Sequence, residues 1–444
     1  MIGGMALHYQ HLAERVLSQR ELQPNLYGSI DFEAVPYRLT VDARDESTLP
    51  GWLAKREPIL QDARVLELIS TATMLGDVVA DPYAALEPQY GTKTLVSMLK
   101  QACSEGVDAV PGAPPELRAF IAAMEATPEW VDMELVEEGA RLMRPGAAFL
   151  APFATRGAFL ATFTNTYAAL PMALTGALSG KRAARRINET SNFFTVTTLP
   201  GALERYGLGF EAAAMVRLMH SMVRFHALTR PGAWDSEVYG IPIPQVDQMP
   251  AGLLNMYVIA LGALRKGKTN FSRRERAMLE IGRYRCFLLG LPEELLPTSA
   301  EDIVQVFHAR AATLRAGFDD ATCGALVRST MEAYLRPEET WFDRAADSVE
   351  RSWSKFTFVR AFVNGDRGKG AAMGVHLTNT DVAKVAATAP FILGRFALVE
   401  GASRVPVIQN PVDDYTIRMI HKRLKTYGNP EFTTDAKTYA RASA

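Results

Sequence analysis

The residues with the clearest potential for chemistry surround one histidine on an apolar segment. His220 stands in GFEAAAMVRLMHSMVRFHAL, with Arg217 three residues before it and Arg224 four residues after it. These spacings place the three side chains on one face of a helix. An imidazole can bind a metal ion, and two guanidinium groups beside it favour an anion. A haem supplies both partners, iron and propionates, whereas a buried network of carboxylates is the simpler alternative.

The other histidines give weaker signals. The chain has seven, with no HExxH motif and no pair at i, i+4, so a helical zinc site is not expected. His226 is the rival ligand to His220, but it lies six residues further on, about 240° around the helix axis. The two imidazoles therefore cannot serve the same pocket from the same face.

A second polar segment is KRAARRINETSNFF, residues 181–194. Arg186, Glu189 and Thr190 lie at i, i+3 and i+4, so they share one helix face, and Arg182 joins that face one turn earlier. Spacing alone leaves two interpretations open. The segment is either the polar wall of a pocket or a solvated basic helix face.

Together the two segments resemble the latex clearing protein (rubber oxygenase)/MpaB-like family. Arg186 and Thr190 form an Arg-x-x-x-Thr pair, and His220 follows thirty residues after Thr190 inside RLMHSMVR. Two later stretches, residues 239–261 (YGIPIPQVDQMPAGLLNMYVIAL) and 281–297 (IGRYRCFLLGLPEELLP), resemble family segments in the same order. The similarity covers roughly residues 130–400, and it rests on the order and spacing of these motifs together.

The resemblance implies an all-α fold with a globin-like core, additional helices and one non-covalent haem b. His220 would be the proximal axial ligand, and Arg186 and Thr190 would lie on the distal side, where O2 binds. In rubber-cleaving members a lysine precedes the distal threonine and can cap the iron, whereas this chain has Glu189 there. Glu189 could instead serve in proton transfer. No acid near Asn165–Leu170 matches the glutamate that acts as base in rubber cleavage.

The function predicted on this basis is a haem b-dependent oxygenase or dioxygenase for an apolar substrate that contains a C=C bond. Arg217 and Arg224 would bind the cofactor beside His220. The alternative is a haem-binding or gas-sensing helical protein without turnover. A third possibility is an all-helical interaction or membrane-associated protein that lacks the cofactor.

Helical periodicity dominates the chain from about residue 52 onward, and no alternating stretch is long enough for a sheet. The class predicted is therefore all-α. Ser272 and Glu275 form a capping-box pattern, and residues 230–250 are the clearest long loop. The windows expected to be helical are 62–80, 93–104, 115–126, 132–143, 157–178, 181–194, 208–229, 251–265, 272–288, 300–316, 319–334, 338–364 and 380–399. We predict an N-terminal extension (1–50), a haem-binding helical domain (51–400) and a polar C-terminal tail (401–444).

Composition bounds the partners. The formal net charge is -1, which gives no electrostatic footprint for nucleic acid. Three separated cysteines (Cys103, Cys286, Cys323) include no CxxCH motif and suit a reduced compartment. Residues 157–180 carry no charge, and we expect a buried core helix there, with membrane association possible in principle but not favoured. No signal peptide is visible, so a cytoplasmic location is expected. The sequence does not predict the oligomeric state.

Overall fold

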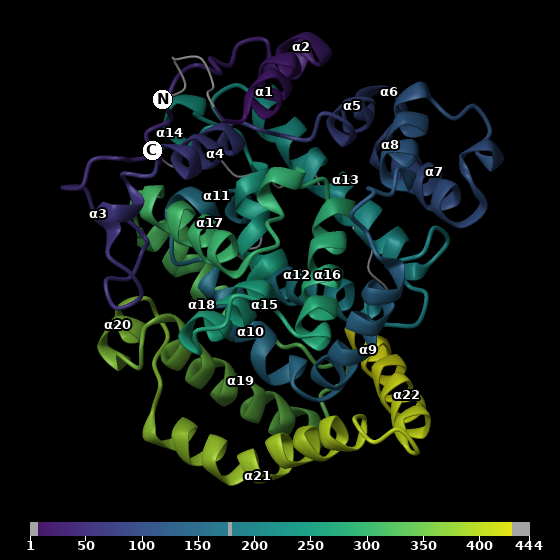
Figure 1. Cartoon of the computed structure of the whole chain (residues 1–444), viewed down its shortest axis with the longest axis vertical. Helices are drawn as coiled ribbons and strands as arrows, with labels where there is room; N and C mark the ends of the chain where they lie inside the picture. Colours follow the sequence, from purple (N-terminus) through teal and green to yellow (C-terminus); the bar gives the residue numbers. More distant parts are fainter. Residues whose placement is uncertain (1–7, 176–179, 429–444) are drawn as a thin grey trace. The chain divides into compact units, whose positions relative to one another are not determined.

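The structure is a computed structural model that describes residues 8–175 and 180–428. Over these residues the chain consists of helices, loops and two isolated β-bridges, with no strand (Figure 1). The predicted all-α class is therefore confirmed. The chain divides into two compact units, which we call the first and the second unit. The domain boundaries that were predicted at residues 50 and 400 stay a prediction.

The first unit contains the described residues of 1–139 and 203–316. It carries α13 (Leu208–Thr229), the helix of His220, which packs against α5 and α7. The remaining elements of this unit are α1 (Gln10–Leu22), α2 (Pro24–Tyr27), α3 (Arg56–Ile59), α4 (Ala63–Thr73), α5 (Ala80–Ala84), α6 (Glu87–Tyr90), α7 (Thr92–Glu105), η1 (Val107–Ala109), α8 (Pro115–Glu125), α14 (Ser236–Tyr239), α15 (Gln245–Arg265), α16 (Arg273–Leu288), η2 (Glu293–Leu295) and α17 (Ala300–Thr313).

The second unit contains the described residues of 140–202 and 317–431. It carries α12 (Gly180–Val196), the helix of Arg186, Glu189 and Thr190. α9 (Met133–Phe149) begins in the first unit and ends in the second. The remaining elements are α10 (Ala151–Ala161), α11 (Thr166–Leu174), η3 (Asp320–Gly324), α18 (Ala325–Glu332), α19 (Trp341–Phe362), α20 (Arg367–Ala372), α21 (Asn379–Ala402) and α22 (Gln409–Tyr427).

α15 begins at Gln245, six residues before the predicted window, and it continues through Pro250. Proline lacks the N–H that would donate to the carbonyl four residues earlier, which here belongs to Val246. The Arg310 Nε–H donates to that carbonyl instead, at 3.1 Å. An arginine from α17 thus satisfies the acceptor that the proline leaves open, and the helix extends into the proline-rich loop.

The uncharged stretch 157–180 is not one helix, which corrects the expectation of a single segment. α10 ends at Ala161, and α11 starts at Thr166 after Asn165, whose side chain accepts from the Ala168 N–H at 3.3 Å. Asparagine is a strong N-cap, and this cap restarts the helix. The stretch does line a core, because Leu160, Phe163, Ala169 and Ala173 are all buried in one hydrophobic cluster. Residues 176–179 lie outside the described part of the chain.

Two described segments near the ends of the chain, residues 8–50 and 401–428, contain buried helical residues. In the N-terminal segment, Leu12, Tyr27 and Phe32 are buried, so α1 and α2 contribute to the core of the first unit. The region expected to be a polar tail contains the 19-residue helix α22, with Ile420 fully buried. α22 packs against α12. Its sequence is polar overall, so the burial of a few positions on one side was not evident from composition.

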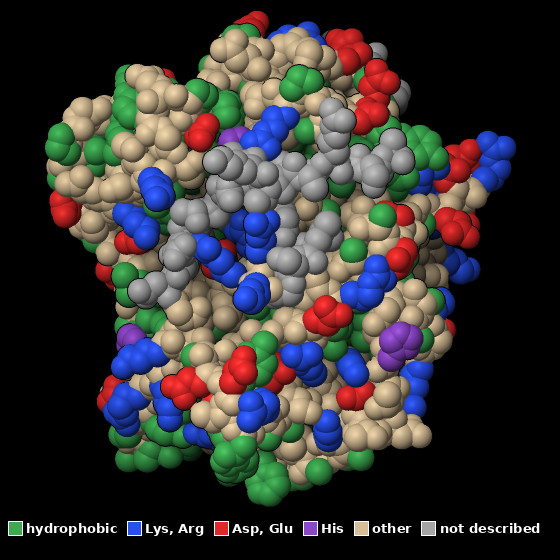
Figure 2. Space-filling model, turned by 180° about the vertical axis from the view of Figure 1, so that it is seen from behind, with side chains coloured by type: hydrophobic (Ala, Val, Ile, Leu, Met, Phe, Trp, Pro, Cys, Tyr) green, Lys and Arg blue, Asp and Glu red, His purple; other side chains and the backbone are tan. Residues whose placement is uncertain are grey.

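α21 differs from the other described helices in its surface. It is the one described helix that is long and apolar enough to cross a membrane by length and composition, and 11% of its most apolar window is buried. It lies beside α19 (Figure 1) and exposes Phe391 and Leu398 at 78% and 76%. Figure 2 shows hydrophobic side chains along the lower edge, where α21 lies in Figure 1.

Candidate active site

His220 stands at the start of a hydrogen-bond relay in the first unit. Its Nδ1 lies 2.9 Å from Oε1 of Gln248, and Gln248 Nε2 donates to Gln245 Oε1 at 2.6 Å. Gln245 Nε2 in turn donates to the backbone carbonyl of Gly76 at 3.0 Å. Both glutamines are buried on α15, whose early start at Gln245 places them there.

The end of this relay determines the direction of every bond in it. A backbone carbonyl can only accept, so the Gln245 amide nitrogen faces Gly76, and the Gln248 amide nitrogen must then face Gln245. Gln248 Oε1 is left to accept from His220, which places a proton on Nδ1. In the neutral imidazole the basic lone pair then belongs to Nε2. A hydrogen bond that fixes the tautomer in this way is typical of histidines that bind a metal.

Arg217 and Arg224 are paired with buried aspartates. Arg217 Nε lies 2.6 Å from Oδ2 of Asp77, and Arg224 Nε lies 2.9 Å from Oδ1 of Asp81. Arg224 and Asp81 are both completely buried, and the Tyr27 hydroxyl also donates to Asp81. The structure therefore shows the carboxylate network that the sequence left open as the simpler alternative. That Arg217 and Arg224 also bind a cofactor stays a prediction.

The two aspartates respond differently to their surroundings. Burial would raise the pKa of Asp77, but the Arg217 guanidinium outweighs it and holds this pKa at about 2. Burial raises the pKa of Asp81, with the Asp77 charge acting in the same direction and Arg224 opposing both. Gly290 lies against the Arg217–Asp77 pair and has a φ of +90°. A Cβ at this position would lie 2.7 Å from Asp77 Oδ2. The glycine of the LLG stretch is therefore needed for this close approach.

On α12 the predicted residues do come together. Glu189 is buried and contacts two guanidinium groups, with Arg185 Nε at 3.1 Å and Arg186 Nη1 at 3.2 Å. Thr190 is half-buried, and Arg182 is exposed. Arg186 and Glu189 thus form an ion pair on the helix face that they were predicted to share. These residues belong to the second unit, whereas His220 belongs to the first.

Several other residues have structural roles. Phe163 lies in a hydrophobic core, and Asn165 caps α11. His226 is buried against Phe225, and burial lowers its pKa. The three cysteines are buried and free, and burial raises the pKa of each thiol. Within residues 8–175 and 180–428, no group of three or more His, Cys, Asp or Glu side chains could hold a metal ion.

Sequence reasoning missed the partners of His220, Arg217 and Arg224. Gln245 and Gln248 sit at i, i+3 in QVDQMP, inside the stretch that resembles the family, and this spacing was an available signal. Asp77 and Asp81 lie about 140 residues before the arginines that they pair with. No local pattern links them, and only the packing of α5 against α13 brings them together.

The comparisons with known proteins agree with this fold. Residues 141–391 match the family described as ER-bound oxygenase mpaB/B'/rubber oxygenase, catalytic domain. No curated protein sequence matches the chain. Among solved structures, the chain is similar to that of latex clearing protein in the closed state, with a TM-score of 0.54 at 18% identity, over 79% of this chain and 91% of that one.

The match covers more than half of the chain, so this protein belongs to the mpaB/rubber oxygenase family. The matched range lies inside the span of residues 130–400 that the sequence motifs had indicated, and the resemblance is confirmed. The likeness to the solved structure supports the all-α fold. Family membership makes the protein an oxygenase by class.

Proposed function

We propose that this protein is a haem b-dependent oxygenase that acts on an apolar, C=C-containing substrate, with His220 as the axial ligand of the iron. The observation that carries the proposal is the relay from His220 through Gln248 and Gln245 to the Gly76 carbonyl. When the imidazole is neutral, this relay leaves its basic lone pair on Nε2, as binding of a metal through that nitrogen requires. Bound to this site, the haem would supply the iron that activates O2.

The chemistry of the donors fits this cofactor. Haem brings its own four equatorial nitrogen ligands, so one histidine from the chain is sufficient for axial binding. The Gln248 acceptor would keep the ring oriented and raise the basicity of Nε2. We assign no propionate contact to Arg217 or Arg224, because Asp77 and Asp81 already accept hydrogen bonds from them.

Arg186 and Thr190 would act on the oxygen substrate. A guanidinium and a hydroxyl are donors suited to a developing negative charge on oxygen. Glu189, held by Arg185 and Arg186, is the candidate for proton transfer. It also stands where rubber-cleaving members are expected to have a capping lysine, so we propose that no side-chain amine closes the distal position.

The substrate class follows from the family, which includes rubber oxygenases. Cleavage of a C=C bond into two carbonyl groups takes up both atoms of O2 and needs no net external reductant. An apolar alkene, polymeric or small, is therefore the proposed substrate. Polyisoprene itself is one candidate among these alkenes.

The first experiment is a visible absorption spectrum of the purified protein after reconstitution with hemin. Wild type and His226→Ala should both show a Soret band that shifts on reduction and on addition of CO, because His226 is not the ligand. His220→Ala should lose this band or change its position. An unaltered spectrum in His220→Ala would refute the assignment, and a protein that takes up no hemin would refute the haem.

A second measurement separates an oxygenase from a haem-binding sensor. O2 uptake is followed with polyisoprene latex and with short isoprenoid alkenes, and carbonyl products are trapped. Uptake that is matched by carbonyl formation, and that falls in Arg186→Met, supports catalysis. Haem binding without any uptake on these alkenes would favour the sensor instead.

A further inference from the structure

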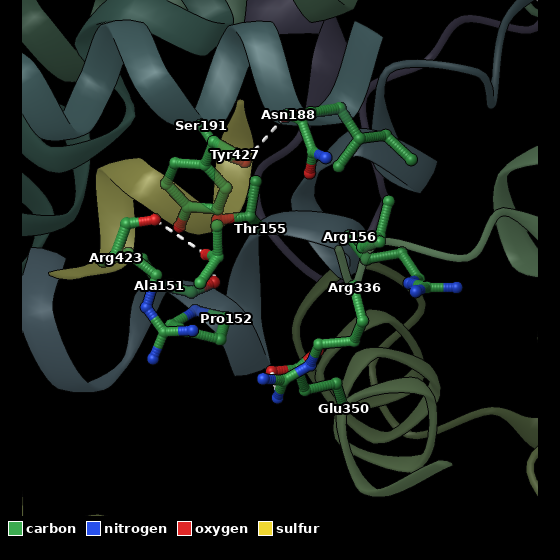
Figure 3. Close-up of a pocket in the computed structure, with 13 residues that line it drawn as sticks. Ala151, Pro152, Thr155, Arg156, Asn188, Ser191, Arg336, Glu350, Arg423 and Tyr427 are labelled. Carbon is green, nitrogen blue, oxygen red and sulfur yellow. Dashed lines mark hydrogen bonds and ion pairs between the residues drawn. The ribbon is translucent and has the colours of Figure 1, made fainter. Parts of the chain in front are cut away.

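A second candidate site lies wholly within the second unit. A cavity of about 360 Å³, part of it open to solvent, lies between α10, α12, α19 and α22. Figure 3 shows Asn188 and Ser191 approaching it from one side and Arg336 and Glu350 from the other. Its lining residues are Ala151, Pro152, Thr155, Arg156, Ile187, Asn188, Ser191, Leu335, Arg336, Glu350, Arg423, Thr426 and Tyr427.

This cavity is separate from the predicted catalytic face of α12. At about 100° per residue, Asn188 and Ser191 lie about 200° and 140° around the helix axis from Arg186, and Ile187, at about 100°, lies between the two faces. The α12 residues that line the cavity are those three. Asn188 and Ser191 therefore reach the cavity from a different face of α12 than the one that carries Arg186 and Thr190.

The charges at the cavity do not balance. Three guanidinium groups and one carboxylate line it, those of Arg156, Arg336, Arg423 and Glu350, which leaves an excess of two positive charges in the described lining. Asp347, which does not line the cavity, is shared by Arg156 and Arg351.

The pairing is uneven within this set. Asp347 accepts from Arg156 at 2.9 Å and from Arg351 at 2.6 Å, and Glu350 accepts from Arg336 at 2.5 Å. Arg423 lies close enough to influence Glu350 electrostatically, but it makes no ion pair with either acid. A buried or half-buried cation without a counter-charge is costly.

Unsatisfied polar atoms gather at the same place. Seven buried side-chain nitrogen or oxygen atoms in the described chain have no hydrogen-bond partner, and four of them belong to residues that line this cavity. They are Nε of Arg156, Arg336 and Arg423 and Oδ1 of Asn188. The Arg156 side chain is itself fully buried. Such groups usually have a partner, so several of them around one cavity indicate a ligand.

We propose that this cavity binds one small oxyanion, a phosphate or a carboxylate. The anion would offset the excess positive charge and accept from guanidinium N–H groups of the lining, in the charge-assisted manner typical of guanidinium. Ser191, Thr155 and Tyr427 add hydroxyl groups to the lining. Asn188 Oδ1 can accept from a protonated ligand oxygen, such as that of hydrogenphosphate.

The test is titration of the full-length protein with sodium phosphate and with sodium acetate, at constant ionic strength maintained with NaCl. Wild type should bind at least one of them saturably at one site, which also raises Tm. Tighter binding of phosphate identifies a phosphate-type ligand, and tighter binding of acetate identifies a carboxylate. Absence of saturable binding by either anion would overturn the proposal.

Two substitutions should act in opposite directions. Arg423→Gln removes one cation and should weaken binding about tenfold or more. Glu350→Gln removes the competing acid, frees Arg336 and should tighten binding. Arg328→Gln is the matched control, because Arg328 is half exposed, pairs with Asp320 and lines no part of the cavity. If Arg423 and Glu350 had only structural roles, both substitutions would change anion affinity in the same direction. That result would also overturn the proposal.

Discussion

Two sets of buried and half-buried arginines, one in each unit, are balanced by carboxylates to different degrees. In the first unit, Arg224 is completely buried and pairs with the equally buried Asp81, while Arg217 pairs with Asp77. In the second unit, Arg336 is 16% exposed and pairs with Glu350. Arg423 also acts on the Glu350 carboxylate electrostatically, and it lowers the pKa of that group. One region balances each cation with its own carboxylate, and the other leaves an excess at a cavity that solvent reaches.

Each arrangement is suited to a different role. A sealed pair holds two helices in a fixed relation, because separating its members would leave a charge in an apolar interior. An unbalanced set beside solvent can take its missing charge from outside. The first arrangement suits the support of the His220 helix, and the second suits a ligand.

The largest expected effect is on the sealed pair. Asp81→Asn leaves Arg224 buried without a carboxylate and should lower the free energy of unfolding by about 3–5 kcal/mol. Urea denaturation followed by circular dichroism measures this loss. Arg404→Gln, an exposed arginine paired with Glu400, should change stability by less than about 0.5 kcal/mol. A comparable loss in both variants would remove the distinction between sealed and surface pairs.

The next largest effect is a loss of stability at acid pH, which arises from the Arg217–Asp77 pair. Arg217 holds the pKa of Asp77 at about 2, below its ordinary value near 3.8. The ionised carboxylate therefore stabilises the folded state fully at pH values above this ordinary pKa. This stabilisation, about 2 kcal/mol, is lost as pH falls from about 4 to 2. Unfolding free energies measured from pH 5 to pH 2 should fall more steeply in wild type than in Asp77→Asn. Parallel curves would show that Asp77 does not titrate in this range.

A third prediction concerns the hydrogen bond from His220 to Gln248 in the first unit. Gln248→Leu removes the acceptor that fixes the tautomer of His220, so hemin affinity should fall about 10–100-fold. Hemin titration followed by absorbance measures it. Gln248→Glu keeps the acceptor for His220 but cannot donate to Gln245, so its affinity should fall less than that of the leucine variant. Equal hemin binding by the leucine variant and wild type would show that the relay has no part in ligation.

The smallest effect is expected at the unbalanced cavity. Burial raises the pKa of Glu350, with the arginines opposing this shift, so its carboxylate is poorly stabilised in the folded protein. Glu350→Gln should therefore lower the free energy of unfolding by less than about 1 kcal/mol, and added phosphate should reduce the loss further. A loss as large as that of Asp81→Asn would mean that the two regions do not differ.

Much of the fold was predictable from periodicity and caps. α13 was predicted over residues 208–229 and occupies exactly the bounds Leu208–Thr229, and the capping box of Ser272 and Glu275 is present. Other elements were mispredicted because tertiary contacts decided them. Arg310 allows α15 to run through Pro250, and burial against α12 stabilises the polar helix α22.

By itself, the sequence determined the all-α class, the family and the shared face of Arg186, Glu189 and Thr190, because these depend on spacing along one helix or on the order of motifs. Only the tertiary structure decided which groups meet His220, Arg217 and Arg224. Their partners Gln248, Asp77 and Asp81 come from other helices. A charge on a helix shows that a counter-charge is needed, but packing alone selects whether an aspartate or a ligand supplies it.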